Sequence, residues 1–310
     1  MEKFISKLST GEQIDLGRMS VVQLQKLLYD EGVLFRDKTL SLPPFSKARK
    51  DFQSEIRVFI EAIVDELSRK RGYKLGSQGA SIKTVKLLKR LLKKNLCSGG
   101  AFFEAGVGRG YAIEQLLSSS EFEGVSIIGC DFHLSSKLLK LAQEKTNLCL
   151  LKGDVKDCIS KLPDDSIDFF YADNVIEHFI PDEVDAIFTE IAKKLKPSAV
   201  VFLIIPNRYS GHNVSYFYSS FTSQDPNHYM EMSFNETTEL MAKYNVVHSE
   251  VCALIPKTNI IFSVESPILL KIKLRFEAFA RKIPIRFLRR FLFVALAYNI
   301  YVLRKAQKAS

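Results

Sequence analysis

A turn containing three alternating glycines follows an apolar, strand-like run in the first half of this 310-residue chain. Residues 103–111 read Phe-Glu-Ala-Gly-Val-Gly-Arg-Gly-Tyr. Because glycine lacks a Cβ atom and readily adopts positive φ, such a turn lets the backbone approach a bound ligand closely. The helix expected after the turn adds backbone N–H groups that have no partner within the helix. The segment therefore predicts a strand, a ligand-binding turn and a helix in succession.

The spacing of the glycines restricts the type of ligand. A dinucleotide site requires Gly-x-Gly-x-x-Gly, whereas here Gly106, Gly108 and Gly110 alternate and Glu104 precedes them. A carboxylate at position 104 would repel a phosphate but could accept a hydrogen bond from a ligand amino group. The turn resembles the first motif of the class I S-adenosylmethionine-dependent methyltransferases, whose cofactor is a cationic nucleoside without phosphate. An ordinary tight turn is the alternative.

An acidic residue also follows the next strand-like run. Asp131 comes directly after the apolar residues 125–130 and 21 residues after Gly110, which is enough for one helix and one strand. In an open α/β sheet, ligands bind outside the carboxyl ends of the strands. We therefore expect the Asp131 carboxylate to bind the hydroxyl groups of a ribose. Capping of a helix that starts near Leu134 is the alternative role.

The resemblance extends to the third strand-like run, residues 148–151. In these methyltransferases an acidic residue after this strand receives the exocyclic amine of adenine, and the next backbone N–H contacts a ring nitrogen. Asp154 and Val155 occupy the matching positions. Because Gly-Asp pairs are common in turns, a surface turn at Gly153 is the competing interpretation.

A histidine shortly after the fourth strand-like run is a candidate catalytic residue. The run, residues 167–172, is followed by Asp173, Asn174 and, four residues further on, His178. Small-molecule methyltransferases carry a similar strand and an acid-x-x-x-Glu-His segment. An imidazole titrates near neutral pH, so His178 could act as a general base. The alternative is that it packs beside the cofactor and organises the loop.

A second histidine lies in the sequence Asp-Pro-Asn-His at residues 225–228. This segment resembles the Asp-Pro-x-His element of methyltransferases that act on sugars, quinones and other natural products. His228 is therefore a second candidate base or substrate ligand, although a turn stabilised by the Asp-Pro pair would use the same residues. The Ser233 and Glu236 spacing is that of a capping box and predicts a helix to about Tyr244.

These positions together predict one site for S-adenosylmethionine at the carboxyl ends of the strands. No metal ligand is expected among them. The predicted cofactor-binding residues are Glu104, Ala105, Gly106, Gly108, Gly110, Asp131, Phe132, Asp154, Val155, Asp173 and Asn174.

The order of the segments predicts the fold. Five strand-helix units follow one another, with candidate site residues only at strand ends, which is typical of a doubly wound α/β sheet. The resemblance implies a seven-stranded, Rossmann-like methyltransferase sheet with an N-terminal helical extension. The predicted regions are a helical N-terminal cap (1–97), the cofactor-binding core (98–255), a basic amphipathic helical insertion (256–297), and the final strand with the tail (298–310).

The N-terminal region is expected to be helical. Apolar residues at helical spacing between Phe52 and Leu67 form one face, and residues 82–95 alternate apolar positions with lysine and arginine. In related methyltransferases such helices cap the cofactor and shape the acceptor pocket, and the resemblance implies the same role here.

Positive charge is concentrated at the C-terminal end. The formal net charge is +9, and residues 256–310 contain 12 Lys and Arg against two acidic residues. A nucleic-acid enzyme would instead surround its active-site cleft with positive charge. Within 256–297, a helix with arginines on one side and apolar residues on the other suits a membrane surface, while a lid or a dimer face is the alternative. The last apolar run, 291–303, is shorter than the ~20 residues that cross a bilayer.

The cysteines and the N-terminus indicate a cellular location. Five cysteines, none of them in a Cys-x-x-Cys pair, are typical of free thiols in a reducing compartment. No apolar signal-peptide region follows the first residues. We therefore expect a cytoplasmic protein, peripheral to the inner face of a membrane if the basic insertion binds lipid.

These features favour an S-adenosylmethionine-dependent methyltransferase that methylates a small molecule or a glycan at oxygen. A quinone or lipid methyltransferase at the membrane surface is the alternative within this class. A noncatalytic module that binds the cofactor or a partner protein is the alternative outside it. No nucleic-acid substrate is expected, because Asp-Asn-Val-Ile stands after the fourth strand where nucleic-acid N-methyltransferases carry Asn/Asp-Pro-Pro-Tyr.

Overall fold

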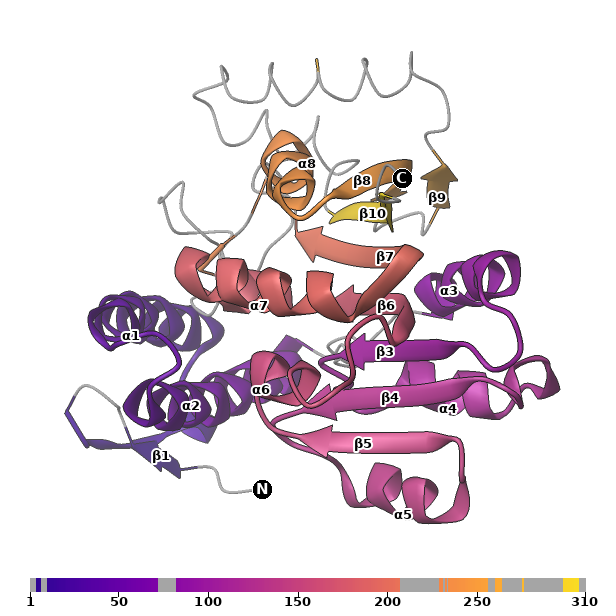
Figure 1. Ribbon diagram of the computed structural model, residues 1–310. Helices are drawn as coiled ribbons and strands as arrows, with labels where there is room; N and C mark the ends of the chain where they lie inside the picture. The colour runs from indigo at the N-terminus through magenta and orange to yellow at the C-terminus, as the bar shows by residue number, and fades with distance from the viewer. Residues whose placement is uncertain are drawn as a thin grey trace. The chain divides into compact units, whose positions relative to one another are not determined.

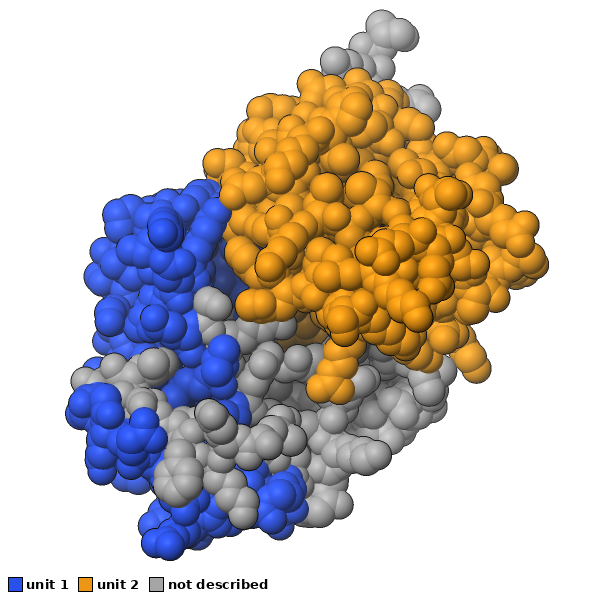
Figure 2. All heavy atoms as spheres, turned by 90° about the horizontal axis from the view of Figure 1, so that it is seen from below, with its two compact units in different colours: residues 1–77, 177–183, 213–230 blue, residues 78–176, 184–212, 231–310 orange. Residues whose placement is uncertain are grey.

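The chain divides into two compact units, which Figure 2 colours blue and orange. Unit 1 consists of Met1–Ser77, Glu177–Glu183 and Asn213–Met230, and unit 2 of Gln78–Ile176, Val184–His212 and Glu231–Ser310. The computed structural model describes residues 4–6, 10–71, 82–206, 229–230, 232, 234–255, 260–263, 275 and 298–306.

Unit 2 is built on an eight-stranded sheet with the order β5-β4-β3-β6-β7-β10-β8-β9 (Figure 1). The five strands from β5 to β7 in this order are parallel to one another. Strand β10 runs antiparallel to both β7 and β8. The predicted doubly wound sheet is therefore confirmed. The strands are β3 (Ala101–Ala105), β4 (Ser126–Asp131), β5 (Leu148–Lys152), β6 (Ile167–Asp173), β7 (Leu195–Pro206), β8 (Val246–Ile255), β9 (Ile260–Ser263) and β10 (Tyr298–Lys305).

The eighth strand is a departure from the seven strands expected. β9 pairs antiparallel with β8, with Ile255 opposite Ile260 and Cys252 opposite Ser263. It lies inside residues 256–297, which the sequence analysis assigns to a helical insertion, so the helical expectation is wrong for these four residues. Two β-branched isoleucines and a phenylalanine favour extended backbone beside an available strand edge. The rest of that insertion, apart from Arg275, lies outside the described residues.

Most helices of the sheet unit connect consecutive strands. Helix α8 confirms the helix expected after the Asp-Pro-Asn-His segment, whereas Ser233 and residues 225–228 themselves lie outside the described part of the chain. The 3-10 helix η3 (Ile176–His178) and helix α7 (Pro181–Lys194) each have residues in both units. The others are α3 (Ile82–Asn95), α4 (Tyr111–Leu117), η2 (Ser120–Phe122), α5 (Ser136–Glu144), α6 (Val155–Ile159) and α8 (Phe234–Lys243).

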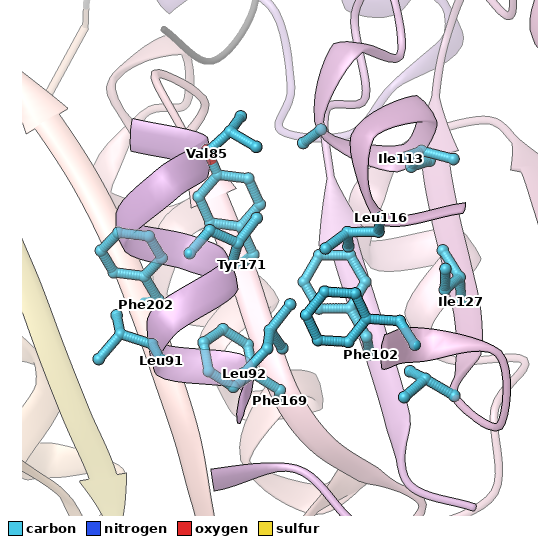
Figure 3. Close-up of a cluster of buried hydrophobic side chains, with 14 of the residues drawn as sticks. Val85, Leu91, Leu92, Phe102, Ile113, Leu116, Ile127, Phe169, Tyr171 and Phe202 are labelled. Carbon is cyan, nitrogen blue, oxygen red and sulfur yellow. The ribbon is translucent and has the colours of Figure 1, made fainter. Parts of the chain in front are cut away.

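Stacked aromatic side chains fill the core on both faces of the central strands. Phe102 of β3 packs with Phe169 and Tyr171 of β6 on the face that α3 and α4 cover (Figure 3). The next residue, Phe103, points to the opposite face and stacks on Phe170 at 5.7 Å between ring centroids. Parallel strands that are covered on both faces need such continuous apolar runs. Helix α3, grouped by the sequence analysis with the N-terminal cap, packs within unit 2.

Unit 1 is built on two long helices, α1 (Val21–Ser41) and α2 (Lys47–Arg71). Ser20 and Gln23 form a capping box at the start of α1. Apolar residues of both helices interdigitate, and Phe35 contacts the rings of Phe52 and Phe59 edge-on. Unit 1 also contains a short hairpin, which the sequence analysis does not predict, made of β1 (Phe4–Ser6) and β2 (Gln13–Asp15), and the 3-10 helix η1 (Leu16–Arg18).

The packing of α3 on the sheet predicts the effect of shortening one of its side chains. Leu88 is fully buried in this core, whereas Lys86 on the same helix is exposed. We expect Leu88→Ala to lower the free energy of unfolding by about 2–5 kcal/mol because it leaves a cavity. Lys86→Ala is the matched control and should change stability by less than ~0.5 kcal/mol. Urea unfolding measures both, and equal midpoints would contradict this packing.

Candidate functional site

Each of the three glycines in the turn between β3 and α4 has a left-handed backbone conformation. Gly106, Gly108 and Gly110 have φ of +68°, +53° and +80°, a region that side-chain-bearing residues rarely adopt. A Cβ atom at Gly106 would lie 2.5 Å from Cγ2 of Val175, and one at Gly110 would lie 2.3 Å from Leu138. The conformation and the close packing therefore both require glycine at these two positions.

The turn is joined to the end of β4 by three hydrogen bonds from its backbone N–H groups. The N–H groups of Gly106 and Val107 donate to the carbonyl oxygen of Cys130, at 2.9 and 3.1 Å. The N–H of Gly108 donates to Oδ2 of Asp131 at 2.8 Å, and Oδ1 of Asp131 accepts from the N–H of His133 at 3.0 Å. The Asp131 carboxylate therefore holds the turn against the end of β4. The helix-capping alternative is wrong, because Ser135 caps α5.

A buried carboxyl group lies at the carboxyl end of the central strand. The Glu104 side chain is 5% exposed, and its Oε2 atom has no hydrogen-bond partner among the described residues. Burial raises the pKa of Glu104 well above its usual value, and the negative charges of Asp173 and Asp131 raise it further. A buried acceptor without a donor costs free energy, so this oxygen is poised to accept a hydrogen bond from a ligand.

A second acidic group at the end of β6 adds to this negative charge. The hydroxyl of Tyr171 donates to Oδ2 of Asp173 at 3.1 Å, and Nδ2 of Asn174 donates to Oδ1 of Asp173 at 2.8 Å. Burial raises the pKa of Asp173 to about 6, although the Tyr171 hydrogen bond opposes this shift. Asn174 has a φ of +54°, and its N–H donates to the carbonyl of Ile204 at 3.0 Å. These bonds hold both side chains at the edge of the sheet.

Tyr171 is the site residue that sequence reasoning missed. Its ring belongs to the aromatic core, while its hydroxyl reaches the carboxyl group two residues later. Burial raises the pKa of Tyr171 well above its usual value, and the neighbouring Asp173 and Glu104 reinforce the shift. Residues i and i+2 of a strand lie on the same face, so the Tyr-x-Asp spacing was a signal that could have identified this pair.

Asp154 caps the start of helix α6, two residues after the end of β5. It is buried, and its Oδ1 accepts from the N–H of Lys156 at 2.8 Å. The surface-turn alternative is therefore wrong for the aspartate. The preceding Gly153 donates its N–H to the carbonyl of Asp131 at 3.0 Å, which joins the ends of β4 and β5. Phe132, next to Asp131, is 37% exposed, so an aromatic ring beside this edge is accessible to a ligand.

The structure thus brings the predicted residues of β3, β4 and β6 into one electrostatic group. The charges of Asp131 and Asp173 both raise the pKa of Glu104, and Val155 follows Asp154 as the first residue of α6. His178 ends η3 and belongs to unit 1, and His228 lies outside the described residues. Among the described residues, no group of three or more His, Cys, Asp or Glu could hold a metal ion.

Comparisons with known proteins indicate the kind of domain that contains these residues. Residues 103–203 fit the family model of a methyltransferase domain. The structure is similar to that of Haemonchus contortus phosphoethanolamine N-methyltransferase 2 in complex with phosphomonomethylethanolamine and S-adenosylhomocysteine, with 21% identity and a TM-score of 0.51 over 76% of this chain. This chain spans only 55% of that enzyme.

The match to a second similar structure extends over most of that protein's length. Burkholderia thailandensis 1,6-didemethyltoxoflavin-N1-methyltransferase, with 1,6-didemethyltoxoflavin and S-adenosylhomocysteine bound, has 14% identity and a TM-score of 0.50 over 86% of this chain and 93% of its own. None of the curated proteins matches the chain. Residues 103–203 therefore match a methyltransferase domain, and the fold is similar to that of both enzymes.

The raised pKa of Asp173 predicts an unusual pH dependence of stability. Between about 4, the pKa in an unfolded chain, and the value of about 6 in the structure, the folded state binds more protons than the unfolded state. The free energy of unfolding of the ligand-free protein therefore falls as the pH rises through this window.

Removing the Asp173 carboxylate should restore the stability that is lost as the pH rises. We expect Asp173→Asn to raise the free energy of unfolding by roughly 1–2 kcal/mol at about pH 7.5 and by much less near pH 4, where the native carboxyl is already protonated. Urea unfolding at several pH values measures the difference. A destabilisation that is the same at every pH would contradict this interpretation.

Proposed function

We propose that this chain binds S-adenosylmethionine at the glycine turn and transfers its methyl group to an oxygen atom of a small molecule or glycan. The observation that carries the proposal is the buried Oε2 of Glu104, which has no hydrogen-bond partner within the described part of the chain, beside a turn that contains three left-handed glycines. A cationic ligand with an amino group would satisfy this oxygen and reduce the repulsion among the three carboxyl groups. A dinucleotide would bring phosphate charge to the same place.

Each strand end would hold one part of this cofactor. Glu104 would accept from its amino group, with Ala105, Gly106, Gly108 and Gly110 allowing close approach of the backbone. The Asp131 carboxylate would bind the ribose hydroxyls, and Phe132 would cover the adjoining ring. Asp154 and Val155 would bind adenine through a carboxylate and a backbone N–H, while Asp173 and Asn174 would close the edge near the amino acid part.

Alignment would supply most of the rate enhancement. The bound cofactor supplies a methyl group on a sulfonium that is already activated. The protein has to hold the acceptor in line with that group and to exclude water, and orientation alone can contribute several kcal/mol, about 7–11 in favourable cases. A hydroxyl acceptor also has to lose a proton, for which His178 and His228 are the proposed bases.

The class of acceptor is supported by the two similar structures. Both enzymes are bound to small molecules and both are N-methyltransferases, so amines belong in any acceptor panel beside alcohols and glycans. A quinone or lipid acceptor at a membrane surface depends on residues 256–297, which lie almost entirely outside the described residues. No helix within the described residues is long and apolar enough to cross a membrane.

Methyl transfer itself is the direct test. Purified protein is incubated with tritium-labelled S-adenosylmethionine and fractions of small molecules, glycans and lipids, and labelled product is counted. Label in a water-soluble fraction is the expected result. Label in the lipid fraction alone would support the lipid alternative, and cofactor binding without label in any fraction would support a noncatalytic module.

The Glu104→Gln variant should have opposite effects on ligand affinity and on the stability of the ligand-free protein. The amide removes a carboxylate that burial disfavours, so the ligand-free protein should melt at a higher temperature. Affinity for S-adenosylhomocysteine should fall at least about tenfold, because the charge-assisted hydrogen bond to the amino group is lost. Thermal shift and calorimetry measure the two effects. Exposed Glu123→Gln on the same unit is the control, and unchanged affinity in Glu104→Gln would contradict the assignment.

Substituting the histidines should reveal whether a base is used. We expect one of His178→Asn and His228→Asn to lower kcat by roughly 10²–10⁴-fold, with the acceptor KM and the cofactor Kd nearly unchanged. Steady-state kinetics with the identified acceptor measure this, and exposed His133→Asn is the control. Equal kcat in all three variants would show that alignment alone drives the reaction.

A further inference from the structure

Unit 1 contains a buried ion pair that the proposed cofactor site does not use. The guanidinium of Arg49, at the start of α2, is fully buried, and its Nη1 lies 3.1 Å from Oε1 of Glu183. Glu183 is itself only 2% exposed. The two residues are 134 positions apart. A buried ion pair is maintained only with good geometry and further hydrogen bonds, because both charges have lost their water.

The other atoms of Arg49 bind the end of α1. Its Nε donates to the carbonyl oxygen of Thr39 at 3.0 Å, and Nη2 donates to the same oxygen. One planar guanidinium therefore joins the last turn of α1 to Glu183. Lysine could not make these contacts together, since its ammonium group is a point charge without the fork geometry.

Glu183 transmits this anchoring to the segment that carries His178. Its Oε2 accepts from the N–H of Ile180 at 3.2 Å, three residues earlier, as a glutamate at the third helical position does in a capping box. Its Oε1 also accepts from the N–H of Phe45, in the connection between α1 and α2, at 3.3 Å. The C-terminal end of the segment 177–183 is thus anchored to the N-terminal helices.

Tyr229 holds the other end of the same segment. Its N–H donates to the carbonyl of Glu177 at 2.7 Å, and the N–H of Met230 donates to the same oxygen at 3.1 Å. The Tyr229 hydroxyl forms a hydrogen bond of 3.1 Å with Oγ1 of Thr39. His178, directly after Glu177, therefore lies in a segment fixed at both ends to α1 and α2.

We infer that Arg49 is a positioning residue that sets the placement of His178 through Glu183. Helices α1 and α2 would then determine where His178 lies within unit 1. Variation in α1 and α2 would alter acceptor alignment without altering the cofactor site. The inference rests on the proposed function only in giving His178 a role toward the acceptor, because the anchoring itself is independent of any reaction.

The first test monitors His178 directly and needs no substrate. Histidine labelled with carbon-13 at the ring is followed by NMR, with the His178 signal assigned from His178→Asn. We expect Arg49→Lys and Tyr229→Phe each to shift or broaden this signal, while the His133 signal, from unit 2, stays in place. Arg69→Met, which removes an exposed ion pair of α2 with Glu66, is the control. An unmoved His178 signal in both test variants would overturn the inference.

The second test separates positioning from stability. Arg49→Met leaves a buried carboxylate without its cation and should strongly lower the melting temperature. The double variant Arg49→Met/Glu183→Gln removes both charges and should recover much of that loss. We nevertheless expect its kcat to stay at least tenfold low, with the Kd for S-adenosylhomocysteine within about twofold of the parent protein. Recovery of kcat together with the melting temperature would show a purely structural role and overturn the inference.

The two tests also distinguish this inference from the proposed function. If no acceptor is methylated but the His178 signal responds to Arg49→Lys, the anchoring holds and only the proposed reaction fails. If methyl transfer is normal and the signal does not respond, the reaction stands and the anchoring fails.

Discussion

The buried carboxyl group of Glu104 is the constraint on which the chemistry of unit 2 depends. It ends the central strand of the sheet, where the pairing of β3 with β4 and β6 brings two more acidic residues within electrostatic reach. Three negative groups gathered at one edge are unfavourable in a ligand-free protein. Protonation reduces this cost in the ligand-free protein, because the pKa values of Glu104 and Asp173 are raised, and a bound cation would offset it. The arrangement therefore favours a positively charged ligand over a phosphorylated one.

The glycine turn and Asp131 make this arrangement rigid. The carboxylate of Asp131 accepts the N–H of Gly108, so the residue that we propose to bind ribose also holds the turn in its left-handed conformation. Asp173 is held in a similar way by Tyr171 and Asn174. Ligand-binding groups whose orientation is fixed before binding lose little conformational entropy when the ligand arrives.

Local patterns in the sequence were sufficient to predict the sheet and most of the acidic residues at the carboxyl ends of its strands. The glycine spacing, and the acidic residues at the ends of β4 and β6, predicted positions that the structure places at strand ends. The capping role of Asp131 was wrong because Ser135 provides the cap, and the surface turn at Asp154 was wrong because this residue is buried, which depends on packing that no local pattern shows. The buried pair of Arg49 and Glu183 could not be anticipated, since no local pattern connects residues 134 positions apart.

Proton-linked calorimetry tests the central claim most directly. S-adenosylmethionine is titrated into the protein near pH 6.5 in two buffers of different ionisation enthalpy, and the difference in heat gives the number of protons exchanged. The account predicts binding at one site with net release of protons, because the arriving cation lowers the raised pKa values of Glu104 and Asp173. It also predicts a smaller release in Glu104→Gln. An absence of binding, or binding with proton uptake, would contradict it.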